Sequence, residues 1–462
     1  MAVNWLSARD PKPGARRGVQ LGRAWASCLA VWLALALPGH LWADPVAADT
    51  SADGVILSML ANLRDNGFDP DPRINGGLGG LWINWRYGTR PLQVNFNGAG
   101  TPDGAKVDPP RHDELTDLRY LHNLLSWKHF HPGDTQFDRD LERYTAIVKR
   151  EFANTHNERG WMYDELMDMA RLSGDAFFRQ TARGLAEYYA TKQVKDDIGA
   201  VYKTRDTNPR GYYRVDNALQ IGCALVQAGV EFNQPDWSRK GERLVNFVYD
   251  HAYLRDYHLF LNQMDEVRLP DGSANPNEKI YREPFRNYVA DGGVVRFGNI
   301  GQIALSLLHA YIVTKQAVYL ERANDLLQPL TAGKNTLGLW DAKHGGYFNG
   351  VQFDGPDFRH PGKPKLLDAK KESGRQFHML QAFHVANRLT DGKYQGMEEA
   401  LARVLVDHAY YPPGHGIFYE SLPDWSPLKA RTKNGELADW VTSEAMGCAM
   451  MALFSLQEKE PW

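Results

Sequence analysis

The sequence predicts an all-α domain in which six helical hairpins close into a ring, the (α/α)6 toroid, with short β-hairpins in the loops between pairs. Three observations predict this fold class. Twelve helical segments follow one another along the chain, short links join the two members of a pair whereas longer loops separate the pairs, and a glycine-led motif occurs at two distant points. An open α-solenoid is the alternative architecture for the same alternation.

Hydrophobic periodicity places the helices in order along the chain. The predicted helices span residues 51–64, 113–128, 137–152, 161–172, 176–190, 213–230, 236–251, 296–311, 317–330, 372–389, 396–410 and 437–456. Strand-like segments cover 81–97, 259–269, 345–350 and 416–422, and the polar stretch 270–294 has no clear period. The first and last helices lack a sequence neighbour to pair with, so in a closed ring they would pair with each other.

The repeated motif consists of two glycines, an aromatic strand, an Asn-Gly or Asp-Gly turn, a Lys, and a helix with the sequence Arg-x-x-His. Three-residue spacing puts the Arg and the His on one face of the helix. The two copies begin at Gly79-Gly80 and Gly345-Gly346, and their helices carry Arg119 with His122 and Arg375 with His378.

Composition restricts the class of function. The chain has 462 residues, of which 24% are charged and 43% hydrophobic, as in ordinary globular proteins. The formal net charge of -3 argues against a broad basic surface for nucleic acid. With 13 Trp, 21 Tyr and 19 Phe, the chain is rich in aromatic side chains that suit both a core and the stacking of sugar rings.

The N-terminal segment has the pattern of a secretory signal. Basic residues from Arg16 to Arg23 precede an apolar run from Ala24 to Leu37, which is too short for a comfortable membrane span. Leu41-Trp42-Ala43 is an acceptable cleavage site. A twin-arginine route and an uncleaved anchor are the alternatives, and we expect no later segment to cross a bilayer.

We therefore expect residues 1–43 to be a secretory signal peptide and residues 44–462 to be a single (α/α)6 catalytic domain in a bacterial periplasmic or secreted protein. The expected partner is a poly- or oligosaccharide substrate, with no nucleic acid and no stable membrane span after signal cleavage. No phosphate-binding loop, serine elbow or metalloprotease motif is present, so we expect no cofactor and no metal.

Two features have a simple structural interpretation. Cys223 and Cys448 lie in apolar helical patterns and are predicted to be buried thiols, with a disulfide as the alternative. Lys370-Lys371-Glu372 is predicted to be a solvated helix start.

The alternation has a consequence for chemistry. In such a toroid every second helix is an inner one, the inner helices run parallel, and their N-termini, which carry unpaired N–H groups and partial positive charge, meet at one mouth. Any one acid there is readily explained as a helix cap, but the recurrence at all six inner starts favours a shared cavity. The polar and aromatic residues near these starts are Asp113, Glu114, Arg119, His122, Trp161, Tyr163, Asp164, Glu165, Arg214, Asp216, Asn217, Arg296, Asn299, Gln302, Arg375, His378, Asp439, Trp440 and Glu444.

Among these residues the acids indicate glycoside hydrolysis, which usually needs one carboxyl as acid and another as base or nucleophile. Asp164 is flanked by Trp161 and Tyr163, and burial against apolar groups would raise its pKa so that it can donate a proton. Asp216 and then Glu444 are the candidates for the second carboxyl.

The two Arg-x-x-His pairs indicate a different chemistry. The Arg could neutralise a carboxylate on a substrate while the His moves a proton. That combination suits proton abstraction at C5 of a uronate or proton transfer at C2 of a reducing sugar. The structural alternative is that each Arg binds a loop carbonyl and each His is a satisfied core residue.

At these residues the chain resembles the six-hairpin (α/α)6 sugar-active proteins, and locally the N-acylglucosamine 2-epimerase group. His344-Gly345-Gly346-Tyr347-Phe348 resembles that group's glycine hairpin. His378-Met379-Leu380-Gln381-Ala382 resembles its His-Met/Leu-Leu-Glu-Ala helix, whose His takes part in proton transfer, and Glu420 with Asp424-Trp425-Ser426-Pro427 resembles the stretch that follows. The group's Gly-His before Glu-Trp appears here as Glu436 to Trp440 without the His, which argues against epimerisation because that reaction normally needs two proton-transfer groups.

The preferred interpretation is an exported glycoside hydrolase, with Asp164 as acid, Asp216 or Glu444 as base, and Trp161, Tyr163 and Trp440 stacking on sugar rings. A polysaccharide lyase using Arg375, His378 and a Tyr, an epimerase or isomerase, and a non-catalytic glycan-binding toroid are the alternatives. The predicted catalytic residues are Asp164, Asp216, Glu444 and His378, and the predicted substrate-binding residues are Arg119, His122, Trp161, Tyr163, Glu165, Arg214, Arg296, Arg375 and Trp440.

Overall fold

The computed structural model describes residues 51–86, 112–153, 159–195, 200–201, 212–266, 281–282, 294–331, 337–355, 360–431 and 437–458. Residues 49–462 form one compact unit. The predicted signal segment, the far part of the first hairpin and most of the polar stretch 270–294 lie outside the described residues.

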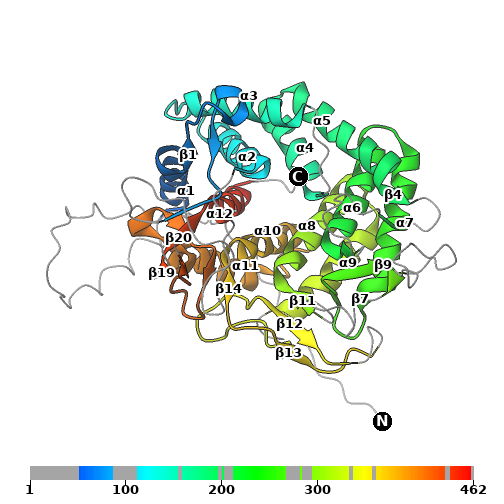
Figure 1. Cartoon of the computed structure of the whole chain (residues 1–462). Coiled ribbons are helices and arrows are strands. Elements are labelled where there is room, and N and C mark those ends of the chain that lie inside the picture. The colour runs from blue at the N-terminus through cyan, green and yellow to red at the C-terminus, as the bar shows by residue number, and fades with distance from the viewer. Residues whose placement is uncertain are drawn as a thin grey trace, which may run out of the picture. The chain divides into compact units, whose positions relative to one another are not determined.

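Six inner helices form a closed ring within this unit, because each packs on the next and the last packs on the first (Figure 1). The inner helices are α2 (Glu114–Phe130), α4 (Trp161–Ser173), α6 (Val215–Glu231), α8 (Phe297–Thr314), α10 (Ser373–Leu389) and α12 (Ser443–Ser455). The predicted (α/α)6 toroid is confirmed, and the open solenoid is excluded by the packing of α12 on α2.

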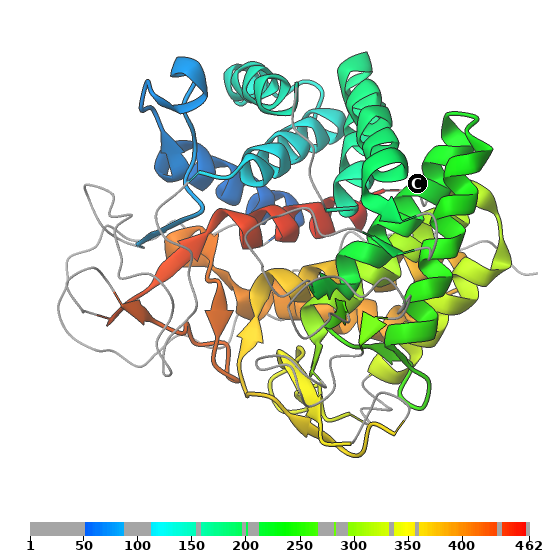
Figure 2. The same cartoon turned by 45° about the vertical axis from the view of Figure 1, so that its right-hand side comes forward.

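Six outer helices surround the ring and are joined to inner partners (Figure 2). They are α1 (Ala52–Asn62), α3 (Asp138–Phe152), α5 (Ala176–Tyr188), α7 (Pro235–Ala252), α9 (Ala317–Leu327) and α11 (Gln395–Arg403). Inner and outer helices differ in how much of their surface is buried. α6 is buried on nearly every side between its neighbours, whereas α7 buries one stripe that includes Leu244, Val245 and Val248.

The ring is closed by contacts between the first and last parts of the described chain. α1 packs against α12 and α2, which confirms the predicted pairing of the first and last helices. β3 (Asn84–Arg86) pairs antiparallel with β20 (Trp440–Thr442), with Val441 opposite Trp85. Ser443 at the start of α12 adds a backbone hydrogen bond of 3.0 Å to the carbonyl of Ile83.

Two inner helices begin two or more residues later than the periodicity predicts, α6 at Val215 and α12 at Ser443. The residues before them form β6 (Tyr212–Arg214) and β20, and β11 (Val294–Arg296) ends at the residue before α8. β6 pairs with β9 (Gln263–Glu266), which pairs with β10 (Tyr281–Arg282), and β11 pairs with β12 (Gly350–Phe353), which pairs with β13 (Pro364–Leu366). The predicted helix starts at Tyr213 and Leu437 are therefore wrong, because partners distant in the sequence draw these residues into ladders, whereas Arg296 is the N-cap of α8.

The other strands are short antiparallel pairs in the loops. They are β1 (Phe68–Asp69) with β2 (Gly80–Leu81), β4 (Val194–Lys195) with β5 (Ala200–Val201), β7 (Tyr253–Leu254) with β8 (Leu259–Phe260), β14 (Lys371–Glu372) with β17 (Glu420–Ser421), β15 (Tyr410–Tyr411) with β16 (Gly416–Ile417), and β18 (Ala430–Arg431) with β19 (Leu437–Ala438).

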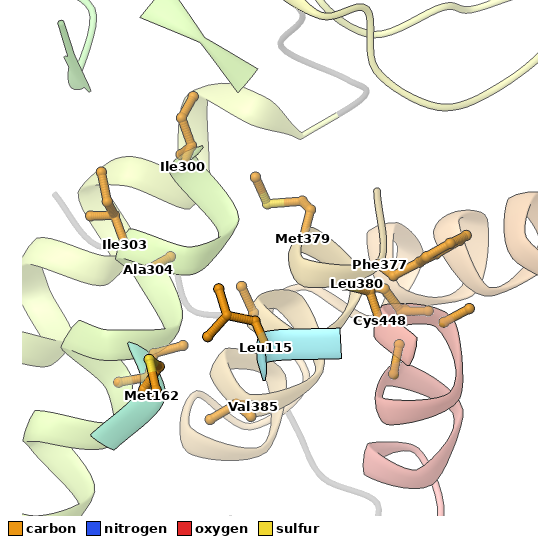
Figure 3. Packing of buried hydrophobic residues seen from close by; sticks show 14 of the residues in the cluster. Leu115, Met162, Ile300, Ile303, Ala304, Phe377, Met379, Leu380, Val385 and Cys448 are labelled. Carbon is orange, nitrogen blue, oxygen red and sulfur yellow. The ribbon is translucent and has the colours of Figure 1, made fainter. Parts of the chain in front are cut away.

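The core lies where the inner helices meet, and Figure 3 shows apolar side chains of α2, α4, α8, α10 and α12 gathered there. Gly301 lets α8 and α10 approach closely, since a Cβ atom at this position would lie 2.7 Å from the backbone nitrogen of Met379. Cys223 and Cys448 are buried free thiols on α6 and α12, as predicted.

α8 is long and apolar enough by composition to cross a membrane, with a mean hydropathy of 1.2. We expected no segment beyond the N-terminal one to be apolar enough to cross a bilayer, and the composition of α8 corrects that expectation. Because 67% of the helix is buried within the fold, its composition is explained by its place in the core of the ring.

Lys371 occupies a buried position at the start of α10. Its ammonium group donates to Asp341 Oδ2 at 2.8 Å and to the carbonyls of Gly345 and Pro423 at 2.6 Å each, and it lies 4.7 Å from the ring centroid of Trp425. The prediction of a solvated helix start is therefore wrong for Lys371, whose exposed fraction is 0%. The ammonium group of Lys371 thus connects the second glycine motif and the 420–428 turn to the start of α10.

Backbone conformation and close packing explain why the second glycine of this motif has no side chain. Gly346 has a φ of +81°, and a Cβ atom on it would lie 2.4 Å from the indole of Trp425. The Trp425 indole N–H in turn donates to the carbonyls of His344 and Gly345 at 3.1 and 3.2 Å. A larger residue would strain the backbone and push the indole away from Lys371.

We expect Lys371→Met to lower the free energy of unfolding by about 3–5 kcal/mol, because a buried carboxylate and two carbonyls lose their partner. Chemical denaturation followed by circular dichroism measures the loss. Lys365→Met, which removes the charge from an exposed lysine on β13, is the control and should change stability by less than about 0.5 kcal/mol. Equal stability of the two variants would contradict the role of Lys371.

Two largely buried carboxyl groups, Asp117 on α2 and Glu151 on α3, interact between these helices. Asp117 accepts a hydrogen bond of 2.9 Å from the backbone N–H of Leu81, and burial followed by repulsion from Glu151 raises the pKa of Asp117. Burial likewise raises the pKa of Glu151 to about 7. A carboxyl with a raised pKa stabilises the fold fully below its unfolded pKa, and this stabilisation is lost as the pH rises through the folded value.

The wild-type protein should therefore lose about 2–3 kcal/mol of stability between about pH 4.5 and 7 through Glu151. Glu151→Gln should remove this part of the pH dependence, and Glu142→Gln on the exposed face of α3 should retain it. Urea denaturation at a series of pH values measures the difference. Parallel curves for the wild type and Glu151→Gln would refute the assignment.

Candidate active site

A polar layer lies between the inner helices beside the apolar core that they share. We call it the central polar layer. Its side chains come from α2, α4, α8, α10 and α12, and Glu444 is the most exposed of its acids, at 34%. The members of the layer are Arg119, Glu165, Gln302, Arg375, His378, Glu444 and Cys448.

Arg119 bridges two carboxylates of this layer. Its Nε donates to Glu165 Oε1 and its Nη1 donates to Glu444 Oε1, each at 3.3 Å. The guanidinium carbon lies 4.3 Å from the ring centroid of Trp161. Because Arg119 is only 4% exposed, the cation and both acids interact with little screening by water.

The two bridged acids have opposite pKa shifts. Burial raises the pKa of Glu165, and the nearby Arg119 offsets this only in part. Burial also acts to raise the pKa of Glu444, but Arg375 and Arg119 outweigh it, so the pKa of Glu444 is lowered. Two neighbouring carboxyls that prefer different protonation states are the arrangement that acid–base catalysis uses.

Hydrogen bonds determine the tautomer of His378. Arg375 Nη1 donates to Gln302 Oε1 at 3.1 Å, which leaves the Gln302 amide nitrogen to face His378 Nε2 at 3.2 Å. Cys448 Sγ lies 3.4 Å from the same ring nitrogen, and burial raises the pKa of this thiol to about 11. Both neighbours are donors, so Nε2 is the acceptor and Nδ1 carries the proton.

His378 is also held in its neutral form. Burial, followed by the charges of Arg119 and Arg375, lowers the pKa of His378 well below its usual value. A neutral imidazole with a lone pair on Nε2 can accept a proton.

A small cavity of about 10 Å³ lies on the side of the layer towards the N-termini of α10 and α12. Its walls include Glu372, Arg375, Tyr419 and Glu444. Arg375 Nε donates to Glu372 Oε1 at 3.0 Å. Repulsion from Glu372, together with burial, raises the pKa of Tyr419, so this phenol keeps its proton.

A second cavity of about 60 Å³, the axial cavity, lies on the other side of the layer. His122, His309, His378 and His384 all line it. His122 Nε2 is 2.6 Å from Asp168 Oδ2; burial acts to lower the pKa of His122, but Asp168 outweighs it and the pKa is raised. The sequence analysis did not single out His309 and His384, although His309 follows Gln302 at helical spacing on α8.

Asp164 lies on the wall of the axial cavity and is 13% exposed. It accepts a hydrogen bond of 2.9 Å from Gln227 Nε2, and its Oδ2 is 3.2 Å from His309 Nδ1. Asp216 is 3% exposed in the first turn of α6 and lines neither cavity. The structure does not bring the two acids predicted first into one site.

The remaining predicted residues are scattered. Tyr163 is 1% exposed and does not line the axial cavity, whereas Trp161 does. Trp440 is buried on β20 opposite Arg86, and Arg296 is exposed at the end of β11. Arg214 ends β6, so it precedes the helix in whose first turns it was predicted to lie.

No group of three metal-ligating side chains gathers anywhere in the part of the chain that the structure describes.

We expect Asp168→Asn to lower the pKa of His122, because burial then acts without its opposing carboxylate. Titration of the imidazole signals by nuclear magnetic resonance measures this pKa. Asp138→Asn, at an exposed acid of α3, is the control and should leave the His122 titration unchanged. An unaltered His122 pKa in Asp168→Asn would contradict the pairing.

Comparison with known proteins shows the fold. No protein-family model and no curated protein sequence matches the chain. Among solved structures, an unsaturated glucuronyl hydrolase specific for heparin superposes with a TM-score of 0.56 at 14% identity, covering 87% of this chain and 95% of that one. D-mannose isomerase superposes with a TM-score of 0.57 at 13% identity, covering 89% and 98%.

A family 76 glycoside hydrolase from a bovine Bacteroides thetaiotaomicron strain superposes with a TM-score of 0.54 at 11% identity, covering 88% of this chain and 78% of that one. The chain thus shares its architecture with six-hairpin toroids that act on sugars, as the local resemblance predicted.

Proposed function

We propose that the protein is an exported glycoside hydrolase that cleaves an oligo- or polysaccharide, with Glu165 as the acid and Glu444 as the base or nucleophile. The observation that carries the proposal is the bridge from Arg119 to two carboxyls with opposite pKa shifts. Hydrolases with this fold add support. Export rests on the signal pattern of residues 1–43.

The arrangement supplies both halves of the reaction. Glu165, whose pKa is raised by burial, donates a proton to the glycosidic oxygen as the bond to the anomeric carbon breaks. Glu444, kept ionised by Arg375 and Arg119, takes a proton from the attacking water or attacks the anomeric carbon itself. Arg119 then stabilises the carboxylate that Glu165 becomes.

The acid role falls to Glu165 and not to Asp164 for a geometric reason. Asp164 is hydrogen-bonded to Gln227 and paired with His309, and it is not bridged to a second carboxyl by a cation. Trp161 lies beside Glu165 on α4 and presents a partly exposed ring for a sugar to stack on.

An isomerase or epimerase is the second candidate, and His378 is the observation that favours it. Its neutral ring and Nε2 lone pair suit proton transfer at a carbon next to a carbonyl group. D-mannose isomerase shares the fold. A lyase with a tyrosinate base is disfavoured, because the pKa of Tyr419 is raised.

We expect Glu444→Gln and Glu165→Gln each to lower kcat by about 10²–10⁴-fold in a reducing-end assay on a panel of neutral and acidic polysaccharides. Glu399→Gln, at an exposed acid of α11, is the control and should retain full activity. Asp164→Asn should retain more activity than Glu165→Gln, and the reverse order would return the acid role to Asp164.

Other products would overturn the proposal. Ultraviolet absorbance from an unsaturated sugar would indicate a lyase. Interconversion of monosaccharides without new reducing ends would indicate an isomerase or epimerase, in which case His378→Asn should be the most damaging variant. No product from any substrate, together with glycan binding that survives Glu444→Gln, would indicate a binding protein.

A further inference from the structure

The distance between the two carboxyls of a glycoside hydrolase separates its two catalytic routes. In inverting enzymes the carboxyls lie about 6.5–9.5 Å apart, because a water molecule fits between the base and the sugar. In retaining enzymes they lie about 5–5.5 Å apart, and the second carboxyl attacks the sugar directly. Both roles are open to Glu444 under the proposed function.

The bridge through Arg119 sets the distance between Glu165 and Glu444. Arg119 holds Glu165 Oε1 with Nε and Glu444 Oε1 with Nη1, each at 3.3 Å. The Nε–H bond and the Nη1–H bonds leave the planar guanidinium from different edges and diverge. Oxygens that accept hydrogen bonds along these directions at 3.3 Å lie about 7–8 Å apart. This separation falls in the inverting range and exceeds the retaining one.

A water molecule that attacks the sugar needs a place beside the base. The small cavity at the N-termini of α10 and α12 has a volume of about 10 Å³, which matches the lower limit of about 10–15 Å³ that one water molecule requires. Glu444 lines the small cavity, whereas Glu165 lines the axial cavity on the other side of the central polar layer. The water site thus lies on the side of the base and away from the acid, as inversion requires.

Two carboxylates of the small cavity can accept hydrogen bonds from this water. Glu444 receives Arg119 at Oε1, and Glu372 receives Arg375 at Oε1. Oε2 of each carboxylate has no hydrogen bond to another described residue. The side chains of Glu444 and Glu372 are 34% and 26% exposed, so solvent reaches both of them.

Tyr419 adds a donor to the same cavity. Repulsion from Glu372, together with burial, raises the pKa of Tyr419, so the phenol keeps a proton to donate. A water that donates to Glu444 and Glu372 and accepts from Tyr419 has three partners, the usual number for an ordered water. Its second lone pair stays available for the anomeric carbon.

We propose that the hydrolysis inverts the anomeric carbon, with Glu444 as the base for a water molecule that Glu372 and Tyr419 hold in the small cavity. This inference rests on the proposed function. The water oxygen bonds to the anomeric carbon as the bond from that carbon to the glycosidic oxygen breaks. Glu444 takes a proton from the water, Glu165 gives its proton to the departing oxygen, and both carboxyls exchange protons with solvent before the next turnover.

The configuration of the first product tests the inference. The substrate is the polysaccharide of the neutral and acidic panel that yields new reducing ends, and proton nuclear magnetic resonance follows the anomeric signals before mutarotation mixes them. We expect a product of opposite configuration to the cleaved linkage. A product of the same configuration would overturn inversion and leave the proposed hydrolysis intact. No new reducing ends from any substrate would overturn the proposed function, and inversion with it.

Methanol in the buffer gives a second readout that mutarotation does not affect. A retaining enzyme passes its covalently bound sugar to methanol and forms a methyl glycoside, whereas an inverting enzyme has no covalent intermediate. We expect mass spectrometry to find hydrolysis products alone. A methyl glycoside among the products would overturn the inference.

Tyr419→Phe tests where the water is held. The variant should lower kcat by about tenfold with little change in KM, the equivalent of one hydrogen bond lost in the transition state. Tyr311→Phe, at a partly exposed tyrosine of α8 that lines neither the small cavity nor the axial cavity, is the control and should keep full activity. Equal kcat for the two variants, or a raised KM at unchanged kcat in Tyr419→Phe, would show that Tyr419 does not hold the water.

Discussion

The pairing of buried charge around Arg119 is the constraint on which the centre of the ring depends. A guanidinium that is 4% exposed is tolerated only because Glu165 and Glu444 accept its hydrogen bonds and Trp161 covers its face. These partners come from α4 and α12, and Arg119 itself lies on α2, so the bridge also fixes how these three inner helices stand relative to one another. The split in pKa between the two acids needs more than the bridge, because the charge of Arg375 adds to that of Arg119 in lowering the pKa of Glu444, whereas burial outweighs Arg119 at Glu165.

Lys371 is a second buried cation that holds neighbouring segments together. It holds the second glycine motif against the start of α10, and the helix then carries Arg375 and His378 into the central polar layer. The tautomer of His378 is set in turn by Arg375 acting through Gln302. The motif thus fixes where α10 begins, and Arg375 on that helix orients the buried imidazole through Gln302.

The parts of the fold that were predictable are those with local causes. Helical periodicity and loop lengths are properties of neighbouring residues, and they predicted twelve helices and a closed ring. The helix starts at Tyr213 and Leu437 were wrong, because β6 and β20 find partners far away in the sequence. Lys371 was misjudged for the same reason, since Asp341 and Pro423 are its neighbours only after folding.

For the site, the sequence by itself determined which polar residue types stand near the starts of the inner helices, because capping and helical spacing are local. Arg119, Glu165, His378 and Glu444 were all among the candidates. Only the tertiary structure decided how they combine, bridging Glu165 with Glu444 and turning Asp164 towards His309. Pairing and pKa depend on the distance between side chains on different helices and on their burial, and no pattern along the chain encodes either quantity.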